Sequence, residues 1–196
     1  MFFTILMILI SIFVVWGVLV WLRKTSWDAV HRNLLDLEDN YEGRVIRRGF
    51  ASRPIFHGKY NNFGLTVNFS TAKSTDGRLT YIDISYEKSG SLSLSISDRK
   101  WLESQEAGEL QDYKSIITDS GAELIVRPVS VEAVQRLLNK KSFLDLLNNF
   151  DNLAYIFIGK SGVISEFITR EVIKETEFLK MNERIILIDK LIKAVG

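Results

Sequence analysis

Residues 2–22 read FFTILMILISIFVVWGVLVWL and contain neither a charged residue nor a proline. One threonine, one serine and one glycine are the only interruptions among the large apolar side chains. At 1.5 Å per residue, a helix of about 21 residues is roughly 30 Å long, which matches the hydrocarbon thickness of a bilayer. Because no later stretch is as long and as apolar, the sequence predicts one transmembrane helix from Phe2 to Leu22, followed by a globular domain.

Two alternatives to a retained span are a cleaved signal peptide and a buried core helix. A signal peptide has basic residues before an apolar core of about 7 to 15 residues and small residues at its cleavage site. Here no basic residue precedes the run, the run is longer, and Val20-Trp21-Leu22 does not fit a cleavage site. A core helix has a polar face, which this stretch lacks. The pattern therefore favours a signal anchor over both alternatives.

The residues that flank the span predict its orientation. Arg23 and Lys24 follow Leu22 directly, whereas the other flank offers only the terminal amine. Positive charge is retained on the cytoplasmic side, so we expect the domain to be cytoplasmic, with an extracytoplasmic domain as the alternative. Trp21 and Trp27 bracket the basic pair, and with Arg23 and Lys24 they are the predicted interface anchors at the end of segment 1–24. Trp27 also fits a core position on a helix face.

Residues 25–40 have the pattern of a juxtamembrane amphipathic helix. Thr25 and Asp28 have the spacing of a capping box, which predicts that a new helix begins there. Apolar residues recur at spacings of three and four, and the opposite face is acidic. An acidic face is repelled by anionic lipid, so packing on the domain is favoured over lying on the membrane. The apolar stripe consists of Trp27, Val30, Leu34, Leu37 and Tyr41.

Residues 41–196 are predicted to form one α+β domain. Between Tyr41 and Ser97 the side chains alternate between apolar and polar, and Asp76-Gly77 marks a hairpin, so we expect about four antiparallel strands. A polar stretch at 98–108, with a short helix capped by Asp98, separates two halves, 41–97 and 113–196. We expect Ile82, Ile84, Leu92, Leu94 and Ile96 in the core, and Ser93 and Ser95 on the opposite face.

The second half predicts further hairpins and helices. Asp119-Ser120-Gly121 and residues 159–162 are the expected turns of two hairpins. Ser130 and Ser142 are the expected caps of two short helices, and a final helix is expected over residues 175–194. The predicted fold class is therefore a single transmembrane helix and an antiparallel β-meander, with helices on one face and a C-terminal helix.

Composition excludes several classes of function. The 196 residues carry 25 basic and 24 acidic side chains, a net charge of +1, whereas nucleic-acid-binding domains usually have a clear basic excess. The absence of cysteine excludes disulfides, thiolate metal sites and thiol catalysis. We therefore expect no nucleic-acid partner.

No cofactor motif is complete in the sequence. Gly159-Lys160-Ser161 resembles the end of a phosphate-binding loop, but that motif needs a glycine where Ala154 stands, so a hairpin turn is favoured. His31 is followed by Leu34 and Leu35 at the third and fourth positions rather than by a second ligand, and His57 is expected in a loop. We therefore expect no cofactor, no metal and no catalytic residue identifiable by motif.

A basic run lies close in sequence to the predicted membrane surface. It has one acidic neighbour, Glu42, and consists of Arg44, Arg47, Arg48, Arg53 and Lys59. Basic residues close to an anionic leaflet are attracted by about 1 kcal/mol each, so the run is a candidate contact for anionic lipid or an acidic protein partner. The alternatives are a solvated strand face and, with the interleaved aromatic residues, single-stranded nucleic acid.

These features favour a non-enzymatic, membrane-anchored protein-interaction or structural module. The alternatives are a lipid- or small-ligand-binding domain, which would need an apolar pocket, and a carboxylate-based hydrolase or transferase, which would need paired buried carboxylates. Sequence spacing cannot show whether two carboxylates converge in a cleft, so the alternatives stay open at this stage.

Overall fold

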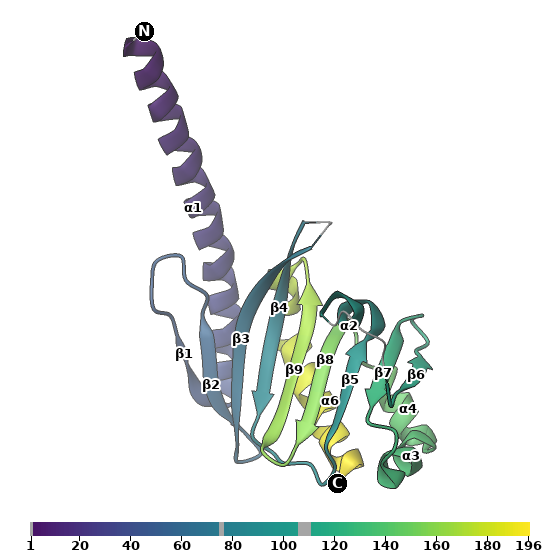
Figure 1. Ribbon diagram of the computed structural model, residues 1–196. Helices are drawn as coiled ribbons and strands as arrows, with labels where there is room; N and C mark the ends of the chain where they lie inside the picture. Colours follow the sequence, from purple (N-terminus) through teal and green to yellow (C-terminus); the bar gives the residue numbers. More distant parts are fainter. Residues whose placement is uncertain (1, 75–76, 106–110) are drawn as a thin grey trace.

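The computed structural model of the chain describes residues 2–74, 77–105 and 111–196. A long N-terminal helix, α1 (Phe2–Asn40), projects from a body built on one large sheet (Figure 1). By length and composition α1 is able to cross a membrane, and its apolar N-terminal part is not buried against the domain. The predicted fold class, an apolar N-terminal helix followed by an antiparallel sheet with helices, is confirmed.

Within these described residues, nine antiparallel strands form a single sheet in the order β1-β2-β3-β4-β9-β8-β5-β7-β6. Because β9 pairs with β4 and β8 pairs with β5, the two predicted halves of the domain share this sheet. The strands are β1 (Glu42–Ile46), β2 (Ile55–Tyr60), β3 (Phe63–Ser74), β4 (Gly77–Tyr86), β5 (Leu94–Asp98), β6 (Lys114–Ile117), β7 (Glu123–Arg127), β8 (Leu153–Gly159) and β9 (Gly162–Thr169).

Helices cover one face of the sheet, which we call the inner face. Figure 1 shows the C-terminal half of α1 and the helix α6 (Phe178–Val195) behind the strands. The shorter helices are α2 (Arg99–Gln105), α3 (Glu132–Leu138), α4 (Lys141–Leu147) and α5 (Val172–Glu175). The core lies between the inner face and the helices other than α2, since inward-pointing strand residues and the apolar faces of α1 and α6 belong to one cluster of buried side chains.

The predicted core register of the central strands is confirmed in β4 and β5. Ile82, Ile84 and Ile96 are fully buried and Leu94 is 1% exposed, as the alternating pattern requires. The strand β5 begins at Leu94, so Leu92, expected in the core, is only partly buried. The serines on the opposite side of β5 become more buried along the strand: Ser93 is exposed, Ser95 is half-buried and Ser97 is buried.

The predicted start of a new helix at Thr25 is wrong, because α1 continues without a break from the apolar run to Asn40. The hydroxyls of Thr25 and Ser26 donate to the carbonyl oxygens of Trp21 and Leu22, at 3.0 and 3.1 Å. Such bonds to the preceding turn are those of residues inside a helix, not of caps. The predicted stripe is otherwise correct: its first four members are buried and Tyr41 is partly buried.

The helix caps predicted at Ser130 and Ser142 were wrong. Ser130 does not cap α3; its hydroxyl donates to Asp112 at 2.6 Å, and the residue before the helix is Val131. Likewise α4 begins after Lys140 rather than at Ser142. By contrast, the predicted C-terminal helix is confirmed as α6, which begins at Phe178 rather than at residue 175, because α5 ends before Thr176, whose buried hydroxyl donates to carbonyl oxygens of α5.

Several other local predictions are confirmed. The Asp98 carboxylate accepts the backbone N–H of Trp101 at 2.9 Å and so caps α2. The expected hairpins around residues 118–122 and 159–162 join β6 to β7 and β8 to β9. The strands β3 and β4 form the third hairpin, although Asp76 of its predicted turn lies outside the described residues. In the described part of residues 41–97 there are five strands rather than the expected four, and the additional strand, β2, contains His57.

Candidate functional site

The five residues of the predicted basic run differ in their position and exposure. Arg44 and Lys59 are exposed on β1 and β2, with Lys59 at the end of its strand away from the loop that joins them. Arg47, Arg48 and Arg53 lie in that loop, between Ile46 and Ile55, which we call the β1–β2 loop. Only Arg48 is an exposed member of these three.

Arg47 is a structural link between the β1–β2 loop and α1. Its guanidinium forms an ion pair with Asp28, which also pairs with Lys24 at 2.6 Å, one turn earlier in the helix. Hydrogen bonds from Lys24 and then from Arg47 hold the pKa of the Asp28 carboxyl below its ordinary value. Arg47 also donates to the carbonyl oxygens of Phe50 and Ser52, at 2.8 and 3.0 Å, so it fixes the shape of the loop.

Arg53 also has a structural role, because it joins the β1–β2 loop to β3. Its guanidinium donates to the Phe69 carbonyl oxygen at 2.8 Å and to the Thr71 hydroxyl at 2.7 Å, and it lies 5.9 Å from the ring of Trp27. Desolvation by burial, with smaller contributions from other arginines, lowers its pKa. Trp27 itself is 7% exposed and packs on Phe69 with a centroid separation of 5.4 Å. Of the predicted interface anchors, Trp27 is therefore a core residue, while Trp21 is exposed.

The face of the sheet opposite α1 and α6 carries the second group of candidate residues. We call it the outer face. Two rows of directly opposed side chains cross it, and α2 packs on it near one end. The first row is Asn68, Asp83, Glu166, Tyr155, Ser97 and Ile125; the second is Thr66, Ser85, Ile164, Phe157, Ser95 and Arg127.

An acidic pair lies at the centre of the first row. Asp83 and Glu166 are direct cross-strand neighbours, both half-buried, and carboxylates in this relation repel each other. Burial, and for Glu166 also the charge of Asp83, raises the pKa of both carboxyls. The Ser70 hydroxyl donates to Asp83 at 3.2 Å. Neither of the two cavities described below is lined by either carboxyl, so the pair stands on a sheet surface rather than in those cavities.

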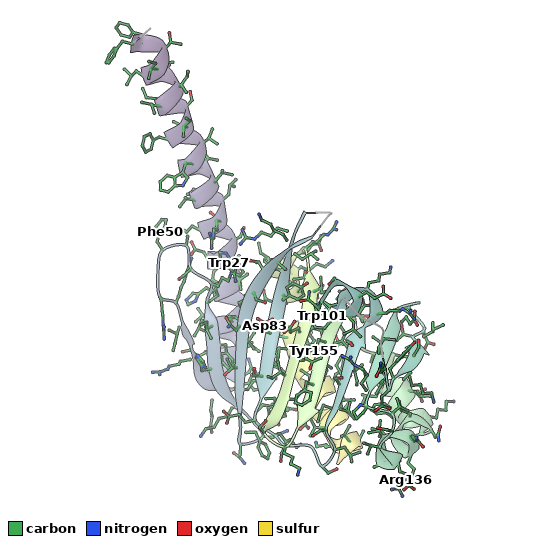
Figure 2. The ribbon with its side chains drawn as sticks, viewed as in Figure 1. Trp27, Phe50, Asp83, Trp101, Arg136 and Tyr155 are labelled. Carbon is green, nitrogen blue, oxygen red and sulfur yellow. The ribbon has the colours of Figure 1, made fainter. Side chains whose placement is uncertain are left out.

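Aromatic residues border the acidic pair. Trp101 of α2 stacks on Tyr155 of β8, with centroids 5.2 Å apart and rings inclined by 22°, and Figure 2 shows both near Asp83. In the second row, Phe157 and Ile164 are opposed across β8 and β9 and are 37% and 50% exposed. The outer face thus combines exposed apolar side chains with negative charge on a rigid scaffold of β-strands.

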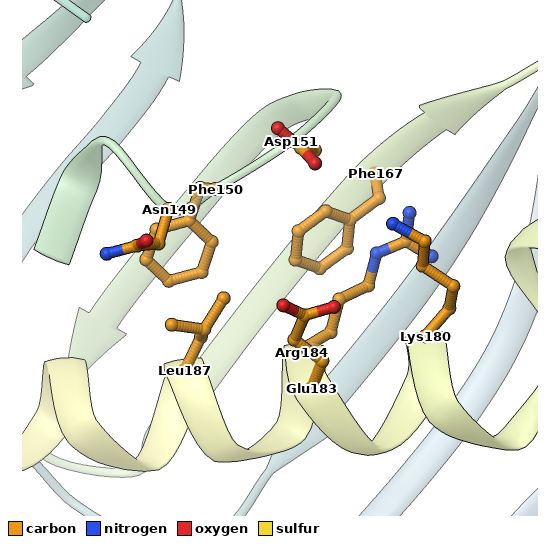
Figure 3. A pocket seen from close by; sticks show the side chains of 8 residues that line it. All are labelled: Asn149, Phe150, Asp151, Phe167, Lys180, Glu183, Arg184 and Leu187. Atoms are coloured by element: carbon orange, nitrogen blue, oxygen red, sulfur yellow. The ribbon is translucent and has the colours of Figure 1, made fainter. Parts of the chain in front are cut away.

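Small cavities lie at other places on the domain. The one in Figure 3 has a volume of about 20 Å³ and lies between α6, Phe167 of β9 and the connection between α4 and β8 that contains Phe150. Arg184 crosses it, 4.8 Å from the Phe167 ring, paired with Glu175 and donating to the Glu175 carbonyl oxygen at 2.9 Å. This volume holds about one water molecule. The guanidinium therefore joins α6 to α5 rather than serving a ligand site.

A larger, shallow cavity of about 490 Å³ lies where α1 meets α5. Its lining includes Ser26 of α1, which is close to the end of the apolar run, and residues of the segment 170–177. Basic and acidic side chains alternate in that segment, and Val172 and Ile173 supply apolar surface. It is a candidate site for a small amphiphilic ligand, because drug-sized ligands occupy cavities of about 300–1,000 Å³.

Among the described residues, neither histidine belongs to a cluster of side chains that could hold a metal ion. His57 lies on β2, where its Nδ1 is 3.2 Å from the Thr66 hydroxyl, so the predicted loop position is wrong. The Nδ1 atom of His31, on α1, is buried without a hydrogen-bond partner. Over the part of the chain that the structure describes, no group of three or more histidine, aspartate or glutamate side chains could hold a metal ion.

Sequence reasoning missed the acidic pair and the stacked aromatic residues, because each pair joins strands or helices that are distant in the chain. The alternation of Asp83 with Ile82 and Ile84 does give the outward direction of that side chain. Nothing in the sequence gives the pairing of β4 with β9, on which the encounter with Glu166 depends.

Comparisons with known proteins place the fold but not the family. No protein-family model matches the sequence, and a search of curated proteins finds no significant match. Among solved structures, the crystal structure of the mycobacterial trehalose monomycolate transport factor A, TtfA, superposes with a TM-score of 0.54. The match covers 86% of this chain and 96% of that one, at 7% sequence identity. At this identity the likeness is one of fold.

Proposed function

We propose that the chain is a non-enzymatic, single-pass membrane protein that presents the outer face of its sheet to a protein partner at a fixed height above the bilayer. The domain would lie on the cytoplasmic side, because Arg23 and Lys24 follow the span. The observation that carries the proposal is the continuity of α1, whose apolar half is long enough to cross a membrane and whose other half belongs to the domain core.

The continuous helix supports a positioning role. A flexible linker would let the domain sample many orientations, whereas an unbroken helix transmits the orientation of the span. Trp27, Val30, Leu34 and Leu37 bury this helix in the core, and the Asp28–Arg47 pair joins it to the β1–β2 loop. A domain held in this way offers the same surface to each partner that moves in the same membrane.

The outer face supports the choice of a protein partner. Aromatic side chains are enriched at protein interfaces and the centres of interfaces are apolar, so exposed Phe157 with Ile164 beside it would provide such a centre. The neighbouring Asp83 and Glu166 would favour a partner that brings basic side chains. A basic partner for the outer face contrasts with the acidic partner that the basic run in the sequence suggests.

Site-specific photocrosslinking in intact cells tests this proposal. A photoreactive amino acid at position 157 of the full chain should give a discrete adduct, which Ile164→Arg should abolish while the protein stays in the membrane. The control places the same amino acid at Asn62, an exposed turn residue outside the two rows. The same adducts at both positions, or adducts insensitive to Ile164→Arg, would exclude the outer face as the docking surface.

A second candidate function is the binding of a lipid or small amphiphile. Two observations favour it: the cavity of about 490 Å³ beside Ser26, and the fold shared with a protein named for the transport of trehalose monomycolate. Native mass spectrometry of the full chain, released from lipid nanodiscs, should then show a retained lipid. Val172→Trp, which fills the cavity, should remove that lipid, whereas Leu179→Trp, at an exposed site outside the cavity, should not.

A further inference from the structure

The β1–β2 loop is held against α1 at the point where the apolar run ends. Arg47 bonds to Asp28 of the helix and to two carbonyl oxygens within the loop, at Phe50 and Ser52. Lys24 shares the Asp28 carboxylate at 2.6 Å. Loop and helix are therefore joined by charge-assisted hydrogen bonds, which are among the stronger contacts of a protein surface.

Phe50 is the exposed aromatic residue of this loop. Its side chain is 67% exposed, and the Lys24 ammonium lies 5.1 Å from its ring centroid. Figure 2 shows Phe50 at the tip of the loop, beside α1 and on the side of the domain from which the helix leaves. Its neighbour Arg48 is also exposed.

The height of Phe50 relative to a bilayer follows from Lys24. Lys24 is two residues beyond Leu22, so it lies about 3 Å further along the helix axis than the last residue of the apolar run. If that run occupies the hydrocarbon, Lys24 lies among the head groups, and the Phe50 ring in contact with it lies there too. Trp21 and Arg23 lie at the same height along the helix, in the head-group region, where aromatic and basic side chains are favoured.

We infer that the β1–β2 loop is a second membrane contact of this protein, with the Phe50 ring in the interfacial layer of the lipid and Arg48 beside the lipid phosphates. The inference rests on the proposed membrane span. An exposed phenylalanine is unfavourable in water and favourable in the interface, and the loop is already built at the required height.

The span and the loop contact together would fix the orientation of the domain, which a single span does not. A lone helix can rotate about its axis and tilt in the bilayer, whereas a span with a side contact has a preferred rotation. The β1–β2 loop would therefore fix which direction the outer face points relative to the membrane. Arg47 and Arg53 act here as positioning residues, and the exposed pair of Phe50 and Arg48 makes the contact.

Nitroxide depth measurements on the full chain in phosphatidylcholine–phosphatidylglycerol vesicles test this inference. The chain has no cysteine, so single labels are introduced as Phe50→Cys, Phe63→Cys and Phe13→Cys. Phe63 is the matched control, a partly exposed phenylalanine in the β2–β3 hairpin, and Phe13 marks the span. Accessibility to oxygen and to a water-soluble nickel chelate is read by power saturation.

We expect the label at position 13 to be accessible to oxygen alone, the label at 63 to be accessible to nickel, and the label at 50 to be several-fold less accessible to nickel than that at 63. A label at Arg48→Cys should give the same interfacial value, which guards against a local effect of replacing Phe50. Equal nickel accessibility at 50 and 63, with position 13 in the hydrocarbon, would overturn the loop contact and leave the span intact. Nickel access at position 13 would overturn the span and the loop contact together.

Discussion

The C-terminal half of α1 should be indispensable for folding, because its predicted apolar stripe lies in the core of the domain. Four of its side chains, Trp27, Val30, Leu34 and Leu37, are at most 7% exposed. Burial of a large apolar side chain contributes about 1.5 to 3 kcal/mol, so the four together contribute roughly 6 to 12 kcal/mol. Since the free energy of unfolding of a domain is about 5 to 15 kcal/mol, their loss removes most or all of it.

Two truncations and one matched pair of substitutions measure this contribution. A chain that begins at Arg23 should be soluble and should unfold cooperatively in urea, whereas a chain that begins at Tyr41 should not. In the chain from Arg23, Leu34→Ala should lower the free energy of unfolding by about 2 to 5 kcal/mol. Leu35→Ala, at a neighbouring position that is 39% exposed, should change it by less than about 0.5 kcal/mol.

The reasoning would be refuted by a cooperative transition of the Tyr41 chain at the same urea midpoint as the Arg23 chain. Equal effects of Leu34→Ala and Leu35→Ala would refute it as well, because one of these side chains is buried and the other is not. Circular dichroism at a helix wavelength and tryptophan fluorescence should give coincident curves for the Arg23 chain, as two-state unfolding requires.

Leu94→Ala should cost about 2 to 5 kcal/mol of unfolding free energy, and an unchanged melting temperature would show that the core register of β5 is incorrect. Burial raises the pKa of Asp83 and Glu166, so their ionisation opposes folding, and stability falls as the pH rises through the folded-state pKa values. Glu166→Gln should therefore stabilise the domain by about 0.2 to 1 kcal/mol at pH 7 and should have no effect below both pKa values, as urea titrations at the two pH values can check. The pH dependence due to Asp189 has the opposite sign. Burial acts to raise the pKa of Asp189, but hydrogen bonds from Lys193 and Lys88 lower it below 3.8. The stability that Asp189 contributes is therefore present above pH 3.8 and is lost as the pH falls through the folded-state pKa. Asp189→Asn should cost about 1 to 3 kcal/mol at pH 7, with the loss disappearing in acid. Protease added to intact cells should leave the domain undigested, and digestion would place it outside.

Local periodicity was sufficient to predict much of the fold. The alternation in residues 82–86 and 94–97 reflects strands with one buried face, and the stripe at spacings of three and four in residues 27–41 reflects a helix against the core. The β2 strand was missed because Gly58 and His57 weaken its apolar alternation. Caps were mispredicted because a serine hydroxyl has several acceptors within reach, and only the folded chain selects one of them.

The candidate site could not be predicted to the same extent, because its contacts are long-range. A count of charges finds five basic residues in residues 41–60, but it does not show that Arg47 pairs with Asp28 or that Arg53 bonds to Phe69 and Thr71. The acidic pair requires the β4–β9 pairing, which no local pattern specifies. Whether a charged residue is free for a ligand thus depends on partners that only the tertiary structure supplies.

The unbroken helix that joins the span to the domain can be tested most directly by a distance distribution between two spin labels in the full chain in vesicles. One label replaces Val15 in the span and the other replaces Ser161 in the turn between β8 and β9. We expect a single distribution as narrow as that of a reference pair within the domain, at Arg44 on β1 and Ser161 in the same turn. A distribution much broader than the reference would reveal a flexible joint near Thr25, and the domain could then not be held at a fixed height and orientation above the membrane.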